Sequence, residues 1–162
     1  MGICAGLLAA SLLRQAPEIP GQTASTTPSA QFLRAVSLGH DSAAATLLWT
    51  SIVASYAQRT ASPSETVAAV RTCGHIDTSW STPWAYGATI VRSLGDVEGH
   101  EALLQEAMAV HPDEYWFPYM LGMSRYLNHG DRAGAADYLE AAADLPGGTE
   151  VHRRAARAIR HR

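Results

Sequence analysis

The stretch Ser81–Gly147 reads STPWAYGATIVRSLGDVEGHEALLQEAMAVHPDEYWFPYMLGMSRYLNHGDRAGAADYLEAAADLPG, and it carries one pattern twice. Each copy has an apolar segment with an aromatic residue, a Gly-Asp pair, an alanine-rich segment and a closing proline. The Gly-Asp pairs are 35 residues apart and the prolines are 34 apart. The matching positions are Trp84, Gly87, Ala88, Val91, Gly95, Asp96, Leu104, Ala107 and Pro112 in the first copy, and Phe117, Leu121, Gly122, Gly130, Asp131, Ala135, Leu139, Ala142 and Pro146 in the second. A repeat of this length predicts stacked units of two antiparallel helices.

Each position of the pattern has a packing role. The aromatic residue fills the gap between units, and the small residues after it let the second helix approach closely. Gly-Asp forms the turn, the aspartate can cap the next helix, and proline ends the unit. The pattern resembles the tetratricopeptide repeat over Ser81–Gly147, and a degenerate third copy reaches back to Asp41. This resemblance implies an all-α fold: a short right-handed solenoid of antiparallel helix pairs.

The chain departs from the family's pattern in each of the three copies. His100 stands where the family has a small alanine, so we expect a loosened helix crossing or a partly exposed imidazole. The second copy has one extra residue before its Gly-Asp turn, and Pro118 lies inside the expected start of its first helix. In the degenerate copy, Trp49 and Tyr56 keep the aromatic spacing, but the Gly-Asp turn is missing.

The residues before the repeats are also predicted to be helical, because no segment shows the sustained alternation of β-branched residues that strands favour. We expect a short helix over Gln31–Leu38 that Gly39 ends. Asp41 or Ser42 can cap the next helix. Its apolar face is predicted to contain Leu47, Leu48, Ile52, Val53 and Tyr56.

A third helix is predicted to begin at Pro63 with Ser64 and to stop at Gly74. This boundary would place Cys73–Asp77 in a loop between helices, with Cys73 packed inside as free cysteines usually are. The loop gathers three potential metal ligands, but it lacks the second cysteine of a haem attachment or zinc site.

These patterns divide the chain into four parts. Residues 1–22 form an apolar N-terminal segment, residues 23–40 a linker with a leading helix, residues 41–147 the helix-pair repeats and residues 148–162 a basic capping helix. Thr149 is expected to cap this last helix. Its apolar stripe is predicted to contain Val151, Ala155, Ala158 and Ile159, with Arg153, Arg154, Arg157 and Arg160 on other faces.

The N-terminal segment leaves two interpretations open. Gly2–Leu13 has no charged residue, and a helix of that length would be about 18 Å long, too short for a hydrocarbon core of about 30 Å. It is either the apolar part of a signal peptide or membrane anchor, or a packed first helix. Phe32–Asp41 with Leu47–Trp49 resembles the start of bacterial envelope tetratricopeptide proteins, which typically follow a membrane helix. This second resemblance implies a membrane-associated or periplasmic location in the bacterial envelope; otherwise the protein would be cytoplasmic.

The charge distribution argues against nucleic-acid binding by the main surface. Seven arginines and fifteen carboxylates give residues 1–150 a charge of −8, whereas the last twelve residues carry +5. A body this acidic repels phosphate backbones. The C-terminal arginines could instead dock an anionic partner, or they could simply be the solvated face of the cap.

No motif predicts catalysis, a bound metal or a cofactor. His100 and Glu101 begin like a zinc-protease helix, but Leu104 stands where the second histidine would be needed. His111–Glu114 reads as a solvated turn between repeats. The aromatic residues Trp80, Trp84, Trp116, Phe117 and Tyr119 are expected to pack, with Tyr119 kept open as a partner contact.

We therefore expect a non-catalytic interaction or scaffold module, an accessory subunit of a larger membrane or envelope complex. Its partner would be a protein subunit or peptide, and the N-terminal segment could add membrane association. First helices line the concave side of such solenoids. On that side the predicted contacts are Thr89, Arg92, Tyr119, Met123 and Tyr126. The alternative is a small metal- or thiol-dependent enzyme or regulator that uses Cys73, His75, His100 and His111.

Overall fold

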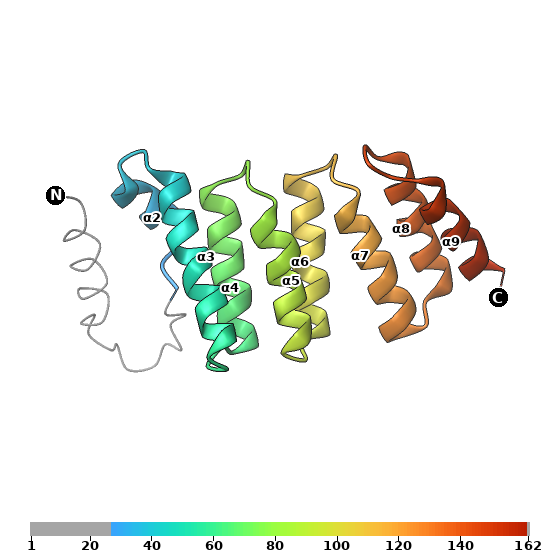
Figure 1. Cartoon of the computed structure of the whole chain (residues 1–162), viewed down its shortest axis with the longest axis horizontal. Helices are drawn as coiled ribbons and strands as arrows, with labels where there is room; N and C mark the ends of the chain where they lie inside the picture. The colour runs from blue at the N-terminus through green and yellow to red at the C-terminus, as the bar shows by residue number, and fades with distance from the viewer. Residues whose placement is uncertain (1–26, 162) are drawn as a thin grey trace.

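The computed structural model describes residues 27–161, so the apolar segment at residues 1–22 lies outside the described residues. Residues 27–161 form helices and connecting turns and contain no strand, which confirms the all-α prediction. Figure 1 shows the helices side by side in one row. They are α2 (Ala30–Ser37), α3 (Asp41–Ala57), α4 (Pro63–Ile76), α5 (Thr82–Ser93), α6 (Val97–Val110), α7 (Trp116–Ser124), the π-helix η1 (Arg125–His129), α8 (Arg132–Asp144) and α9 (Glu150–Arg160).

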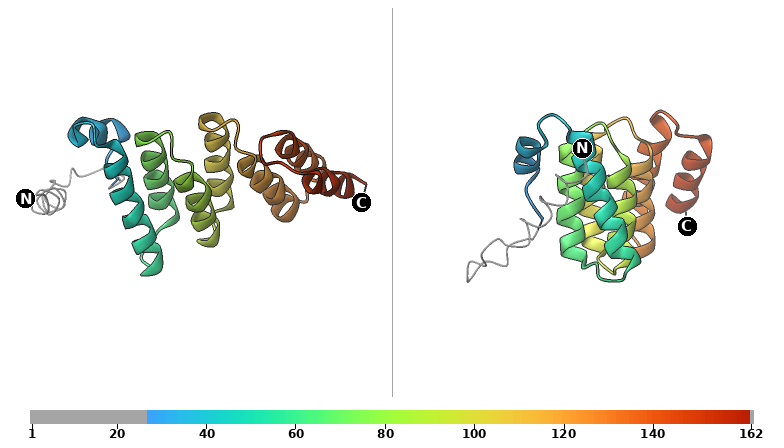
Figure 2. Two further views of the ribbon diagram at one scale, coloured as in Figure 1. Left: turned by 45° about the horizontal axis from the view of Figure 1, so that its top comes forward. Right: turned by 60° about the vertical axis from the view of Figure 1, so that its left-hand side comes forward.

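The row is built from antiparallel pairs. The pairs are α3 with α4, α5 with α6, and α7 with α8, and the second helix of each pair also contacts the first helix of the next. The helix α9 packs on α8 at one end, while the short α2 packs on α3 and α4 at the other. The left view of Figure 2 shows the same elongated row from a second side, whereas the right view looks more nearly along the row, so that the helices overlap.

The core follows the repeat positions. Trp84 and Phe117, the aromatic residues of the two copies, are buried together with Leu104 and Leu121. The alanines predicted at the helix crossings, Ala107 and Ala135, are fully buried. Both copies therefore bury the same side of each helix pair.

Two glycines allow neighbouring helices to approach closely: Gly87 where α5 meets α4 of the preceding pair, and Gly122 where α7 meets α8 of its own pair. A Cβ atom on Gly87 would lie 2.3 Å from the Val70 side chain, and one on Gly122 would lie 3.0 Å from the carbonyl oxygen of Ala135. These separations leave no room for a methyl group. The small residues after the aromatic positions thus set the spacing between neighbouring helices.

The Gly-Asp turns work as predicted in both copies. Gly95 and Gly130 have φ angles of +91° and +65°, a left-handed conformation that glycine adopts readily. The side chain of Asp96 accepts a hydrogen bond from the Gly99 N–H at 2.8 Å, and Asp131 caps α8 in the same way. Each aspartate therefore satisfies an amide that the first helical turn leaves free.

The prediction that Gly74 stops α4 is wrong. The helix continues to Ile76, so Cys73–Ile76 is helical rather than part of a loop. Gly74 is buried, and a Cβ atom there would lie 2.2 Å from the indole ring of Trp84. Because Gly74 has no side chain, the Trp84 ring can pack directly against the backbone of α4, and the helix continues past the glycine.

Two of the predicted helix boundaries differ in detail, and a third is confirmed. Helix α2 ends at Ser37, and Leu38 already has the left-handed conformation, ahead of Gly39. Within the described residues α3 has no side-chain cap, since Asp41 is already its first residue. Helix α4 begins at Pro63 as predicted, and Ser62 caps it by accepting a hydrogen bond from the Glu65 N–H.

The apolar faces predicted for the two end helices are partly wrong. In α3, Ile52 is buried and Leu48 half-buried, but Leu47 is 70% exposed and Val53 and Tyr56 are exposed as well. Helix α4 covers one side of α3, and periodicity alone could not show how wide that side is.

In α9, Val151 and Ala158 are exposed, whereas Ala156 is buried and Ala155 and Ile159 are half-buried. The inward face is therefore rotated relative to the predicted stripe. His152, and not Val151, lies against the aromatic rings of α7.

Candidate functional site

The predicted partner contacts on α5 lie at its exposed side. Thr89 is exposed and its hydroxyl donates to the Ala85 carbonyl at 3.0 Å, while Arg92 is half-buried. Tyr86, one helical turn before Thr89, is 64% exposed on the same side. The sequence reasoning missed Tyr86, although its spacing of three residues from Thr89 places both on one helix face.

This exposed side continues onto the preceding first helix. The hydroxyls of Ser93 on α5 and Tyr56 on α3 are hydrogen-bonded at 3.0 Å, and both residues are exposed. Tyr56, Tyr86, Thr89 and Ser93 therefore form a stripe of exposed polar and aromatic side chains, which we call the α3–α5 stripe. Tyrosine is enriched in the buried centre of protein–protein interfaces, so the two exposed tyrosines of this stripe suit a protein-binding surface.

The predicted contacts on α7 are placed differently. Tyr119 and Met123 are half-buried and pack against the cluster formed by Ala136, Leu139 and Ala156. The imidazole of His152 on α9 lies 5.1 Å from the Tyr119 ring, and the Trp116 ring stacks on Tyr119 at 5.3 Å. Helix α9 thus occupies part of the surface that these residues were expected to offer.

The remaining predicted contact, Tyr126, is half-buried within η1. Beside it lies a polar cluster that the sequence reasoning missed, centred on the carboxylate of Glu101 in α6. The Ser124 hydroxyl donates to Glu101 Oε1 at 2.7 Å, and His129 Nε2 lies 2.9 Å from the same oxygen. Arg125 lies 3.5 Å from the other oxygen. We call these residues, with Asn128, the Glu101 cluster.

Burial makes these contacts necessary. The Glu101 side chain is only 9% exposed, and a buried carboxylate is costly unless hydrogen bonds and opposite charge compensate it. Ser124 is fully buried and also accepts a hydrogen bond from Asn128 at 2.8 Å. The cluster therefore ties the end of α7 to the neighbouring pair.

The extra residue of the second copy produces the π-helix. In η1 the Gly130 N–H donates to the carbonyl of Arg125, five residues earlier, instead of four as in an α-helix. The wider π-helical turn takes up the one residue that the second copy has in excess of the first, so that Gly130 and Asp131 can still form the turn into α8. The extra residue was the available signal for the Glu101 cluster, since π-turns occur often at functional sites.

His100 is fully buried, so the expectation of a partly exposed imidazole is wrong. Its Nδ1 lies 2.9 Å from the carbonyl oxygen of Ala88, which can only accept, so Nδ1 carries the proton. Burial lowers the pKa of His100 below its usual value, more than the hydrogen bond to Ala88 raises it. Its Nε2 has no hydrogen-bond partner among residues 27–161.

The four residues of the alternative enzyme hypothesis, Cys73, His75, His100 and His111, do not share one site. Cys73 is buried with its Sγ 3.3 Å from the Ala45 carbonyl, and burial raises its pKa to about 12, which keeps the thiol protonated and unreactive. His75 is exposed and meets the edge of Trp84 at 5.4 Å. His111 ends α6, and burial lowers its pKa. Across the described part of the chain, no three histidine, cysteine, aspartate or glutamate residues are placed to hold a metal.

Three of the four arginines of α9 pair with acidic residues of their own chain. Arg153 pairs with Asp144 at 2.6 Å and with Glu150 at 2.9 Å. Arg160 pairs with Asp137 and Glu140, and Arg157 pairs with Glu150. Arg154 is exposed and has no ion pair with any residue from 27 to 161. Four nearby carboxylates therefore balance the positive field that the sequence predicts here.

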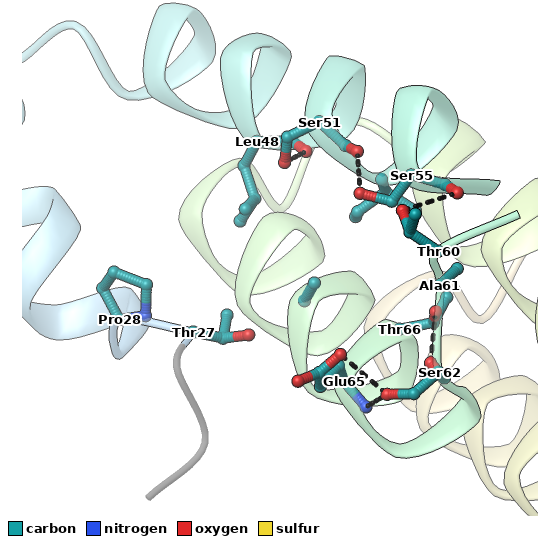
Figure 3. A pocket seen from close by; sticks show the side chains of 12 residues that line it. Thr27, Pro28, Leu48, Ser51, Ser55, Thr60, Ala61, Ser62, Glu65 and Thr66 are labelled. Atoms are coloured by element: carbon teal, nitrogen blue, oxygen red, sulfur yellow. Dashed lines mark hydrogen bonds between the residues drawn. The ribbon is translucent and has the colours of Figure 1, made fainter. Parts of the chain in front are cut away.

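A pocket of about 320 Å³ lies between α3 and α4 (Figure 3). Leu48 and Ile52 contribute its apolar part, and Thr27 and Pro28 close one side. The hydroxyls that line it are largely bonded within the chain: Ser55 donates to the Ser51 carbonyl at 2.9 Å. The lining is therefore mixed, with the carboxylate of Glu65 among its polar groups, and it does not identify a ligand class.

No protein-family model matches the chain, and no curated protein matches it either. None of the helices that the structure describes has the length and hydropathy that a membrane crossing requires.

Proposed function

We propose that the chain is a non-catalytic protein-interaction module built from tetratricopeptide-like helix pairs. The supporting features recur at equivalent positions of the two copies. Gly95 and Gly130 adopt the left-handed conformation of the turn within each pair, and Asp96 and Asp131 cap the second helix of each pair. These are the positions on which the resemblance to the tetratricopeptide repeat rests.

The single observation that carries the function is the α3–α5 stripe. It joins two successive first helices through the Ser93–Tyr56 hydrogen bond, with Tyr56 exposed on α3 and Tyr86, Thr89 and Ser93 exposed on α5. Stacked first helices in solenoid proteins form extended binding surfaces for peptides and helices. Thr89, Arg92 and Tyr86 would contact the partner, and Tyr126 would extend the contact toward η1.

The size of this surface favours an accessory role. Helix α9 occupies part of α7 through His152, which leaves mainly α3 and α5 for a partner. A surface this short suits a subunit held within a larger complex, and the resemblance of Phe32–Asp41 with Leu47–Trp49 to envelope proteins supports our proposal that this complex belongs to the bacterial envelope. Arg154 would supply any contact with an anionic partner, because the other arginines of α9 already pair with carboxylates.

Photo-crosslinking in the native cell tests this proposal. A photoreactive amino acid at Tyr86 should capture one defined protein, because this side chain projects from the stripe. The matched control is the same amino acid at Gln105, an exposed position of α6 outside the stripe. Capture at Tyr86 should fall when Arg92 is replaced by Glu. Equal capture patterns at Tyr86 and Gln105 would contradict a binding surface on the first helices.

A further inference from the structure

The outward face of α3 is open and uncharged. After Asp41 the chain has no charged residue until Arg59, so the rest of this helix of 17 residues is uncharged. The exposed positions of the helix that point away from α4 are small or apolar. These residues, which we call the α3 outer face, are Ala43, Thr46, Leu47, Thr50, Val53 and Ala57. A helix without a charged side is normally covered on all sides.

The hydroxyl groups on this face are turned toward the helix itself. Thr46 donates to the Ser42 carbonyl at 2.7 Å, and Thr50 donates to the Thr46 carbonyl at 2.8 Å. Each of these two hydroxyl donors is thus satisfied within α3. The α3 outer face is therefore more apolar than its composition indicates.

The two ends of the stack differ in this respect. At the C-terminal end α9 covers α8, where Ala156 is buried against Ala136 and Leu139. At the N-terminal end α2 reaches α3 only in part, since α2 has no buried residue and Leu47 remains 70% exposed. Stacked-repeat proteins need a capping element at each end to cover the last apolar face.

We propose that Gly2–Leu13 packs along the α3 outer face and closes the N-terminal end of the stack. This segment lies outside the described residues and is as free of charge as the face it would cover. A helix of its twelve residues would be about 18 Å long, against about 26 Å for α3. The contact is apolar on both sides, and burying it removes Leu47 from water.

The chain between the two parts is long enough for this contact. Residues 14–26 separate the segment from Thr27, and thirteen residues can span about 43–47 Å when extended. Thr27 and Pro28 line the pocket beside Leu48 and Ser55 of α3, as Figure 3 shows. The described chain therefore starts next to the helix that the segment would cover.

The tether favours this occupant over a second copy of the chain. A segment tethered to its site by a short stretch of chain has an effective concentration in the millimolar range, far above that of a separate molecule in dilute solution. A membrane surface fits less well, because helices that lie on membranes carry Lys or Arg along the polar face. The α3 outer face has no basic residue within the helix.

Cross-linking through the native Cys4 tests the proposal in the full chain. One cysteine is introduced on the α3 outer face, as Ala43→Cys, Thr50→Cys or Ala57→Cys, and the protein is mildly oxidised in dilute aqueous buffer. Cys73 does not interfere, because its thiol is buried. The matched controls are Ala109→Cys on α6 and Ala133→Cys on α8, which are exposed elsewhere in the stack.

At least one α3 variant should form an intramolecular disulfide with Cys4 in about tenfold or greater yield than the controls. Non-reducing electrophoresis and intact mass distinguish this product from linked dimers, and circular dichroism checks that each variant is folded. Adding Leu47→Glu to the cross-linking variant should lower the yield, because it places a charge in the contact.

Other outcomes overturn the proposal. Disulfide-linked dimers whose yield rises with protein concentration would assign the face to a second copy. Yields equal to the controls at all three positions would show that the segment does not cover α3. In that case, protection of Cys4 from a water-soluble thiol reagent by phosphatidylglycerol vesicles would identify the segment as a membrane anchor.

Discussion

At the scale of single residues, Gly74 shows how the absence of a side chain can extend a helix. In an open helix, Gly→Ala stabilises by about 1 kcal/mol. We expect Gly74→Ala instead to lower the free energy of unfolding by about 1–3 kcal/mol, because the new methyl would collide with the indole of Trp84. Urea denaturation measures the change, with Ser64→Ala in the exposed first turn of α4 as the control, expected within about 0.5 kcal/mol of the wild type. If Gly74→Ala instead stabilised the protein, the indole of Trp84 could not pack against Gly74 of α4 as described.

His100 gives the chain a predictable response to acid. Burial lowers its pKa in the folded state, so the unfolded state takes up the proton first as the pH falls. The corresponding stability is fully present above the unfolded pKa of about 6.5 and is lost as the pH falls through the folded value. His111 contributes in the same direction. His100→Ala should therefore flatten the fall in unfolding free energy between about pH 7 and pH 5, whereas the exposed control His161→Ala should keep the wild-type slope.

At the scale of elements, η1 depends on the carboxylate that it covers. Glu101→Ala should lower the free energy of unfolding by about 1–3 kcal/mol, because the buried Ser124 hydroxyl loses its acceptor. The control is Gln105→Ala, an exposed change in the same helix, expected within about 0.5 kcal/mol of the wild type. Glu101→Gln should lose less than Glu101→Ala, since an amide oxygen can still accept from Ser124. Equal effects of Glu101→Ala and Gln105→Ala in thermal or urea denaturation would show that the Glu101 cluster does not hold η1.

The elements also show which features a sequence can predict. Repetition predicts Trp84 and Ala107 as core residues, because a residue of the same kind occurs at the matching position of the second copy. It does not predict Gly74, since a glycine reads as a helix stop unless the ring that fills its space is known. The Glu101 cluster is not predicted for a similar reason. Ser124 and His129 lie 23 and 28 residues after Glu101, so only the folded structure shows that they meet it. The pattern also predicts Leu47 on the covered face of α3, where it does not lie, because the width of that face depends on how the neighbouring helix packs.

At the scale of the whole molecule, the stack is a one-dimensional arrangement in which each helix relies on its neighbours. Burial is concentrated in the middle: α4, α5 and α6 contain most of the large central cluster around Trp84 and Leu104. Among the described helices α2 has no buried residue, and α9 has Ala156 alone. Stability should therefore decrease from the middle of the stack toward both ends.

Amide hydrogen exchange measures this gradient directly. We expect the amides of α5 and α6 to exchange slowest, those of α9 faster and those of α2 fastest, because local opening costs least where few apolar contacts are broken. Leu104→Ala, which removes a fully buried side chain at the centre, should speed exchange in α4 through α7 by lowering stability by about 2–5 kcal/mol. Exchange in α2 should change little in this variant, because it already opens without unfolding the centre. Equal protection of α2 and α6 in the wild type would mean that the stack unfolds as a single unit, and the gradient would then be wrong.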